Sequence, residues 1–270
     1  MTTAADRSGA EAATARYLDL AFAGPIAEIG FAAGPLNLVV KPFLRALARA
    51  LAAVEAQEDV RCLIVHGGAA RAFCAGSDIH EFAHLREDAS EQKILYEDMV
   101  VRRLARLPMP TIAAIDAPAL GGGFEVALAC DLRICREGVK LGLTESRLGG
   151  LAGNGSVRLA RLVGPSRAKE LLYTGATIGA EQALAWGLVN RIANGRSALD
   201  EARSLAHEIA ARGPLSNRLA KTLVDESQDL ALDAALSRST VAQQAIFDSD
   251  DLREGMAAFF AKREPNFKGR

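Results

Sequence analysis

The sequence predicts an α/β fold in which strands alternate with helices, followed by a purely helical C-terminal region. The chain has 270 residues, half of them hydrophobic, which is enough for one large core with an appendage. Two short apolar runs, Arg61–His66 and Thr111–Ile115, are typical of buried strands. From Ala198 onward the pattern is helix after helix, so we expect the sheet to be built from the preceding part of the chain.

Each element follows from its local pattern. Gly24-Pro25 separates two short strands and favours a hairpin, and apolar residues at helical spacing predict a helix over Val39–Gln57. The predicted strands are Arg16–Phe22, Ile26–Phe31, Arg61–His66, Thr111–Ile115, Leu132–Cys135 and Lys140–Leu143. The predicted helices are Val39–Gln57, a polar stretch that ends near Leu107, Phe124–Cys130, Ser156–Val163, Arg167–Tyr173, and those after Ala198, with breaks at Gly213-Pro214, Asp229 and Ser249-Asp250.

Composition narrows the class of partner. A formal net charge of -1 argues against nucleic acid or an anionic membrane, because both attract a strongly basic face. No apolar run approaches the roughly 20 residues that span a bilayer. Residues 1–14 lack the apolar core of a signal peptide, so we expect a disordered tail and a cytoplasmic protein. The four cysteines form no CxxC pair and are expected to be free thiols.

Three familiar motifs fail their tests. Residues 80–84 read HEFAH, a literal HExxH, which on a helix would place two imidazoles beside a glutamate, as in zinc proteases. The further histidine of metzincins is absent, although Glu97 could be a distant ligand, so a zinc metalloprotease is only a remote alternative. The glycines of Gly149–Gly155 do not fit GxGxxG, and Ser77 and Ser156 do not lie in GxSxG.

Two glycine-containing turns each follow a predicted buried strand. Residues 73–78, FCAGSD, come after RCLIVH, and Gly121–Gly123 comes after TIAAI. Small residues let the backbone approach a ligand, and the first amides of a helix lack partners. Two such amides from separate turns can stabilise an oxyanion. The alternative is that both segments are simply tight turns.

Two carboxylates accompany the second turn. Glu125 lies just after the glycines at the start of an apolar helix, and Glu145 follows the apolar strand LGLT. A carboxyl group among apolar neighbours has a raised pKa, as a general acid or base requires. Taken singly, Glu125 could merely complement a helix dipole and Glu145 could be an ordinary cap.

These residues resemble the crotonase (enoyl-CoA hydratase/isomerase) superfamily. Arg71–Ile79, RAFCAGSDI, is similar to its CoA-binding loop, and Ala119–Glu125, ALGGGFE, is similar to its second oxyanion segment. The similarity runs in order from about Tyr17 to the C-terminus. Its further segments are Ala129–Asp131, Glu145–Gly149, Leu162–Gly164, Ala180–Val189 and Phe259–Phe267.

The resemblance implies roles for the matching residues. Ser77 and Gly122 would supply the oxyanion amides, and Glu125 and Glu145 would be the two glutamates that family hydratases use. The implied substrate-binding residues are Arg71, Ala75, Asp78, Ile79, Gly153, Asn154, Phe259 and Lys262.

Those binding residues fall into three groups. Arg71 is placed to meet a CoA phosphate, and residues 75, 78 and 79 would line the adenine and pantetheine groove. Gly153 would keep a close-approach position, beside Asn154 near the acyl group, where family hydratases commonly have a Pro-Gly-Ala-Gly-Gly-like stretch. Phe259 and Lys262 would contribute to CoA binding, often from a neighbouring subunit.

The fold implied by the resemblance is a crotonase-like spiral of ββα units. The spiral core would span residues 15–200, and residues 201–270 would form a helical trimerisation region. The expected assembly is a homotrimer or a dimer of trimers. Coenzyme A would enter as part of an acyl-CoA substrate, with no separate cofactor and no metal.

The resemblance and the two carboxylates together predict an enoyl-CoA hydratase of fatty acid metabolism. Glu125 would activate water and Glu145 would protonate the α-carbon of a 2-enoyl-CoA thioester. The main alternative is a double-bond isomerase, or other thioester-enolate chemistry of the superfamily, because these share the oxyanion hole. A catalytically silent CoA-ester-binding subunit is a further alternative.

Overall fold

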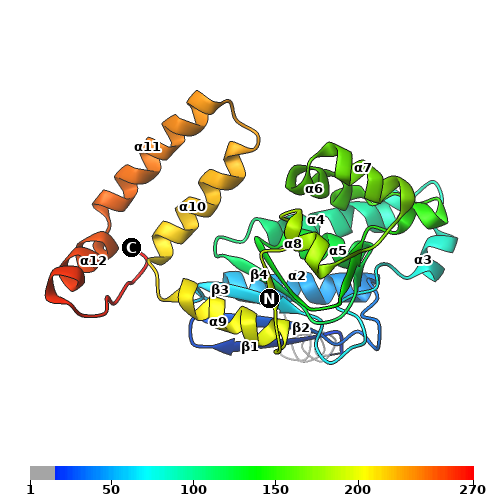
Figure 1. Cartoon of the computed structure of the whole chain (residues 1–270), viewed down its shortest axis with the longest axis horizontal. Coiled ribbons are helices and arrows are strands. Elements are labelled where there is room, and N and C mark those ends of the chain that lie inside the picture. The colour runs from blue at the N-terminus through cyan, green and yellow to red at the C-terminus, as the bar shows by residue number, and fades with distance from the viewer. Residues whose placement is uncertain (1–15) are drawn as a thin grey trace, which may run out of the picture.

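The computed structural model describes residues 16–270, and the tail predicted over residues 1–14 lies outside the described residues. A six-stranded sheet in the order β1-β2-β3-β4-β6-β9 forms the centre, and a three-stranded sheet, β5-β7-β8, lies beside it (Figure 1). The strands are β1 Leu18–Ala23, β2 Ile26–Phe31, β3 Cys62–His66, β4 Thr111–Ile115, β5 Ala119–Leu120, β6 Leu132–Arg136, β7 Lys140–Gly142, β8 Ile178–Gly179 and β9 Arg191–Ala193.

The helices form two groups: those that belong to the body around the sheets, and those that project away from it. The helices of the body are α2 Lys41–Glu55, α3 Ile79–His84, the π-helix η1 Ser90–Ile94, α4 Leu95–Ala105, α5 Gly122–Ala129, the 3-10 helix η2 Glu145–Leu148, α6 Gly153–Val163, α7 Pro165–Thr174, α8 Ala180–Ala185 and α9 Ala198–Ala210. The remaining helices are α10 Pro214–Ser227, α11 Leu232–Asp248 and α12 Asp250–Ala261, which project from the body as an arm (Figure 1).

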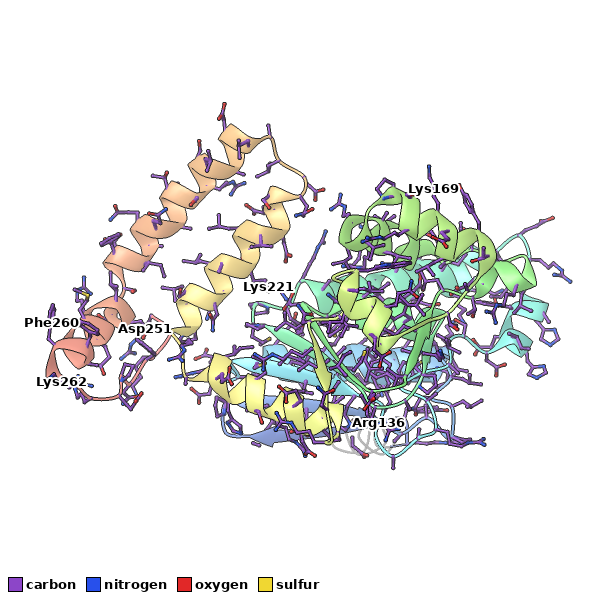
Figure 2. All side chains as sticks on the ribbon, in the orientation of Figure 1. Arg136, Lys169, Lys221, Asp251, Phe260 and Lys262 are labelled. Carbon is purple, nitrogen blue, oxygen red and sulfur yellow. The ribbon has the colours of Figure 1, made fainter. Side chains whose placement is uncertain are left out.

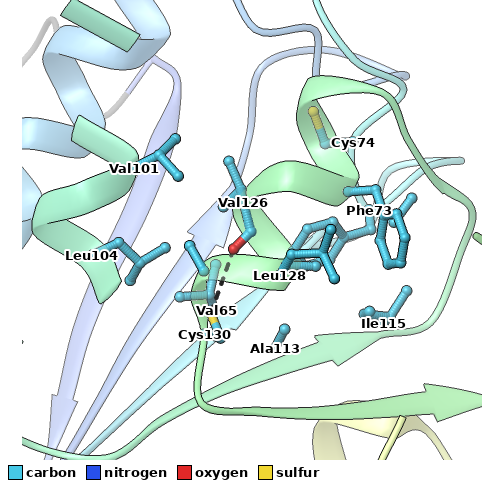
Figure 3. Packing of buried hydrophobic residues seen from close by; sticks show 14 of the residues in the cluster. Val65, Phe73, Cys74, Val101, Leu104, Ala113, Ile115, Val126, Leu128 and Cys130 are labelled. Carbon is cyan, nitrogen blue, oxygen red and sulfur yellow. Dashed lines mark hydrogen bonds between the residues drawn. The ribbon is translucent and has the colours of Figure 1, made fainter. Parts of the chain in front are cut away.

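Two apolar clusters bury the faces of the large sheet. On one face, the small residues Ala198, Ala202 and Ala206 let α9 lie close to β3 and β4. On the other face, Phe73 and Phe124 belong to a cluster with residues of α2, α4 and α5. Figure 3 shows Phe73 of this cluster with Leu104 of α4 and Leu128 of α5. These side chains are almost completely buried, so removing one large member costs about 2–5 kcal/mol.

The parallel arrangement of β3 and β4 positions both glycine turns. β1 and β2 form the predicted hairpin, whereas β2, β3, β4, β6 and β9 are parallel neighbours. His66, the last residue of β3, is paired with Ala114 of β4, so the two strands end at the same edge. The loops that follow them are therefore brought together, as parallel strands require.

The structure corrects several predicted boundaries. The apolar helix expected from Phe124 begins at Gly122, and the helix expected from Ser156 begins at Gly153, because glycines can occupy a helix start. The polar stretch expected as one helix divides into α3, η1 and α4. The sequence pattern does not predict β5, β8 and β9, since two or three residues carry no clear periodicity, and it also misses the six-residue helix α8.

Helix α9 spans the predicted boundary after residue 200 and packs on the sheet, so the projecting part starts only at Pro214. A half-buried ion pair joins this arm to the body: Lys221 of α10, labelled in Figure 2, lies 2.8 Å from the carboxylate of Asp131. None of the helices in the described part of the chain combines the length and apolar character needed to cross a membrane.

Candidate active site

The two glycine turns lie side by side beyond the ends of β3 and β4. The Leu120 amide donates a hydrogen bond of 3.0 Å to the carbonyl oxygen of Cys74, so the two segments pair locally. Gly76 and Gly121 have φ angles of 99° and 52°, in the left-handed region that favours glycine. A Cβ atom on Gly76 would lie 3.5 Å from the Gly122 nitrogen. The backbones therefore approach closely only because side chains are absent.

The main-chain amides of Ser77 and Gly122 are neighbours in this arrangement. Gly122 is the first residue of α5, where amides have no partner within the helix. A Cβ atom on Gly122 would lie 3.8 Å from the Ser77 nitrogen. Within residues 16–270, neither amide donates a hydrogen bond to a backbone carbonyl. Two converging donors of this kind can hold an oxygen that gains negative charge.

Glu125 is fixed between two helices. Its side chain is 8% exposed, and its carboxylate accepts a hydrogen bond of 2.6 Å from the Gly155 amide in the first turn of α6. A Cβ atom on Gly155 would lie 2.9 Å from Cγ of Glu125, so glycine is required there. Burial raises the pKa of Glu125, whereas the Gly155 amide and the nearby Arg158 guanidinium oppose that shift.

Glu145 has a less polar environment. It begins the 3-10 helix η2, and its Oε1 would lie 3.0 Å from a Cβ atom on Gly121. Its Oε2 is buried and has no hydrogen-bond partner in the described chain. Burial, with repulsion from Glu125, raises the pKa of Glu145 to about 7. Glu145 can therefore carry a proton at neutral pH. Glu125 differs from it because the Gly155 amide favours its ionised form.

A third carboxyl group, Glu97, reaches the same place from α4. Its Oε1 would lie 3.2 Å from a Cβ atom on Gly122. Burial raises the pKa of Glu97 to about 7, the charge of Lys93 opposes the rise, and Glu125, Glu81 and Glu145 add to it. The sequence analysis considered Glu97 only as a distant zinc ligand. The missed signal is its spacing, because Glu97 precedes the buried Val100, Val101 and Leu104 on one face of α4.

The site thus combines two unpaired amides with acids in different environments. Burial raises the pKa of both glutamates, but only Glu125 accepts a hydrogen bond from a helix amide, which favours its ionised form. Such a pair can give and take protons beside a developing oxyanion.

A sequence profile described as "Enoyl-CoA hydratase/isomerase" matches residues 22–270. The chain belongs to the enoyl-CoA hydratase/isomerase family. It is 34% identical to methylglutaconyl-CoA hydratase of Mus musculus over 86% of this chain and 76% of that one. It is 38% identical to enoyl-CoA hydratase domain-containing protein 2 of Bos taurus over 86% of this chain and 80% of that one.

Solved structures confirm the predicted crotonase-type fold. The enoyl-CoA hydratase from Bacillus anthracis superposes with a TM-score of 0.90 at 34% identity, covering 94% of this chain and 100% of that one. An enoyl-CoA hydratase from Geobacillus kaustophilus gives the same TM-score at 33% identity, covering 94% of this chain and 97% of that one.

The residues of the predicted CoA loop differ in exposure and in their partners. Asp78 caps α3, since its carboxylate accepts a hydrogen bond of 2.9 Å from the His80 amide, and Ile79 is 54% exposed. Ala75 is half-buried. Arg71 is exposed and lines a surface cavity that also includes Arg136, labelled in Figure 2. Neither candidate catalytic glutamate lines that cavity.

Gly153 and Asn154 stand in the first turn of α6. A Cβ atom on Gly153 would meet no protein atom within 4 Å, whereas Gly155, the third residue of α6, is the glycine that contacts Glu125. The predicted close approach of Gly153 to the substrate stays a prediction. The Asn154 amide donates a hydrogen bond of 2.9 Å to Asp98 on α4. Its role toward the acyl group stays a prediction.

The HExxH segment makes no metal site. The carboxylate of Glu81 lies 3.0 Å from the ammonium group of Lys93, an ion pair that occupies the glutamate. Within residues 16–270, no three histidine, cysteine, aspartate or glutamate side chains are placed to hold a metal ion. The zinc-protease alternative is therefore not supported.

Phe259 and Lys262 lie at the far end of the arm. Phe259 is 77% exposed, and Lys262 caps the end of α12. Figure 2 shows Lys262 on the outer tip of the arm, away from the body that holds the glutamates. Their contact with CoA from a neighbouring copy of the chain stays a prediction.

Replacing Glu145 with glutamine is expected to flatten the dependence of stability on pH. The folded-state pKa of about 7 exceeds the ordinary 4.5, so the folded protein binds more protons than the unfolded chain between these values. This contribution to stability is complete below the lower value and is lost as pH rises through about 7. Thermal unfolding at several pH values from about 5 to 8 should show a smaller fall in Tm for Glu145→Gln than for wild type, by a few degrees. Parallel curves would contradict the raised pKa.

Proposed function

We propose that this enzyme hydrates 2-enoyl-CoA esters to 3-hydroxyacyl-CoA. The observation that carries the proposal is the contrast between the two glutamates beside the unpaired amides. Glu125 accepts a hydrogen bond from Gly155, whereas one oxygen of Glu145 is buried without a partner. Hydration uses both states, since one carboxylate must take a proton from water while the other gives a proton to carbon.

The proposed reaction is a syn addition. The amides of Ser77 and Gly122 would bind the thioester oxygen and stabilise the enolate that forms as water attacks. Ionised Glu125 would take a proton from the water that bonds to the β-carbon. Neutral Glu145 would give its proton to the α-carbon. Glu125 would then release its proton to solvent and Glu145 would take one up from solvent, which restores the starting state of both glutamates. These groups supply the whole reaction, so we propose that no cofactor beyond the CoA of the substrate is needed.

The direct test is hydration of crotonyl-CoA and longer 2-enoyl-CoA esters by the purified protein. Loss of the enoyl thioester absorbance, together with a product heavier by one water, is the expected result. The same protein should be offered 3-enoyl-CoA esters. Conversion of these to 2-enoyl-CoA without any hydration would show that the enzyme is an isomerase and would refute the proposal.

We also propose assembly as a homotrimer or a dimer of trimers in the cytoplasm. The arm exposes several large apolar side chains to solvent. Exposed apolar surface of this kind is typical of a subunit interface, where a neighbouring copy would cover it. These side chains are Leu232, Leu236, Val241, Phe247, Met256, Phe259 and Phe260. Light scattering of the purified protein should give three or six times the chain mass, and a monomer mass would contradict this assembly.

A further inference from the structure

The proposed hydration assigns no role to Glu97, although its carboxyl group lies close to the first residue of α5 in the candidate active site. A Cβ atom on Gly122 would lie 3.2 Å from the Glu97 carboxylate and 3.4 Å from the Ser77 hydroxyl. Glu97 therefore lies beside Gly122, whose amide is one of the two that would hold the thioester oxygen. On the proposed function, the part of the acyl chain next to that thioester lies beside this carboxyl group. In the part of the chain that the structure describes, the Glu97 carboxyl group makes no hydrogen bond and no ion pair within 4.0 Å.

Among the described residues, the cation that acts on Glu97 is Lys93, and its ammonium group already has other partners. Lys93 is 4% exposed, and its ammonium group lies 3.0 Å from Glu81 and donates a hydrogen bond of 3.4 Å to the Val39 carbonyl. It also lies 4.6 Å from the centre of the Phe82 ring. Burial raises the pKa of Glu97, the charge of Lys93 opposes the rise, and Glu125, Glu81 and Glu145 add to it. Glu97 therefore has three carboxyl groups and one already paired ammonium group around it.

We propose that Glu97 determines which acyl groups the site accepts: it favours acyl-CoA esters whose chain carries a neutral hydrogen-bond donor, such as a hydroxyl group, and it disfavours chains that end in a carboxylate. This inference rests on the proposed function, because it places the thioester oxygen at Ser77 and Gly122.

The first preference follows from the free energy lost when a substrate removes water from the Glu97 carboxylate, and the second follows from repulsion between carboxylates. A purely apolar chain would remove water from Glu97 without giving it a partner, which weakens binding. A hydroxyl group can donate to the carboxylate and restores the lost interaction. A second carboxylate would add to the repulsion that Glu125 and Glu145 already exert.

Binding of unreactive esters tests this assignment independently of turnover. We would measure the Kd values of hexanoyl-CoA, 5-hydroxypentanoyl-CoA and glutaryl-CoA by calorimetry at about pH 8, where Glu97 is mostly ionised. Wild type is expected to bind the hydroxylated ester at least about tenfold more tightly than glutaryl-CoA. Glu97→Gln keeps the shape and removes the charge, and it should reduce that ratio several-fold. Glu97→Leu should improve hexanoyl-CoA binding relative to both polar esters.

The matched control is Glu91→Gln, which removes the same charge from an exposed side chain of η1. It should leave the ratio unchanged. Equal wild-type affinity for glutaryl-CoA and the hydroxylated ester would overturn the proposal, as would a ratio that Glu91→Gln reduces as much as Glu97→Gln. Because saturated esters cannot be hydrated, a retained ratio without crotonyl-CoA turnover would refute only the hydratase. Absence of binding by all three esters would refute both.

Discussion

Glu125→Gln and Glu145→Gln are each expected to lower crotonyl-CoA hydration by about 10²- to 10⁴-fold, the range typical of losing a general acid or base. Glutamine preserves the shape of both side chains, and its carbonyl oxygen can still accept the Gly155 hydrogen bond of 2.6 Å at position 125. Binding of butyryl-CoA should therefore stay within about threefold of wild type. Steady-state hydration assays and calorimetry separate the two effects.

Hydrogen exchange distinguishes the roles of the two glutamates. Exchange of the α-protons of butyryl-CoA with D₂O needs a group at the α-carbon but no attacking water. Glu145→Gln should abolish this exchange, whereas Glu125→Gln should retain it. The control is Glu170→Gln, an exposed acid on α7, which should change neither measurement. Exchange lost equally in both variants would show that the roles are not divided in this way.

The sequence was informative where backbone geometry constrains residue type. Gly121 needs a left-handed φ of 52°, and Gly123 would place a Cβ atom 2.3 Å from the Cys74 carbonyl oxygen, so glycine is required at both positions. Glu125 could be found because it interrupts an otherwise apolar helix. The crotonase-type fold was predicted correctly on the same residues, through their resemblance to the family.

Contacts between distant polar residues could not be predicted. Asn154 follows the glycines expected near the acyl group, but its amide bonds to Asp98, which is far away in the sequence. Glu97 lies in a stretch that is polar in sequence, and only its register with Val101 and Leu104 on α4 places it inward. Such register is visible in a sequence only when the helix start is known, and η1 shifts it here.

Gly121→Ala is expected to reduce hydration by at least about 10²-fold, comparable to the loss of one oxyanion donor. The new methyl group would lie 3.0 Å from Oε1 of Glu145 and 3.6 Å from the Cα atom of Gly76. To relieve these contacts, Glu145 or the glycine turn must move, and either shift separates the acid from the amides of Ser77 and Gly122. The substitution therefore affects both proton transfer and the oxyanion hole.

Backbone strain alone must be separated from this local effect. Gly138 also has a left-handed φ, 78°, but a Cβ atom there would meet nothing within 4 Å. Gly138→Ala and Gly121→Ala should both lose stability, by about 1–2 kcal/mol from strain, whereas only Gly121→Ala should lose activity. Urea unfolding and hydration rates, measured on the same preparations, test the pair. If both variants lost activity in proportion to stability, the second glycine turn would have no specific part in catalysis, and the assignment of the Gly122 amide would fail.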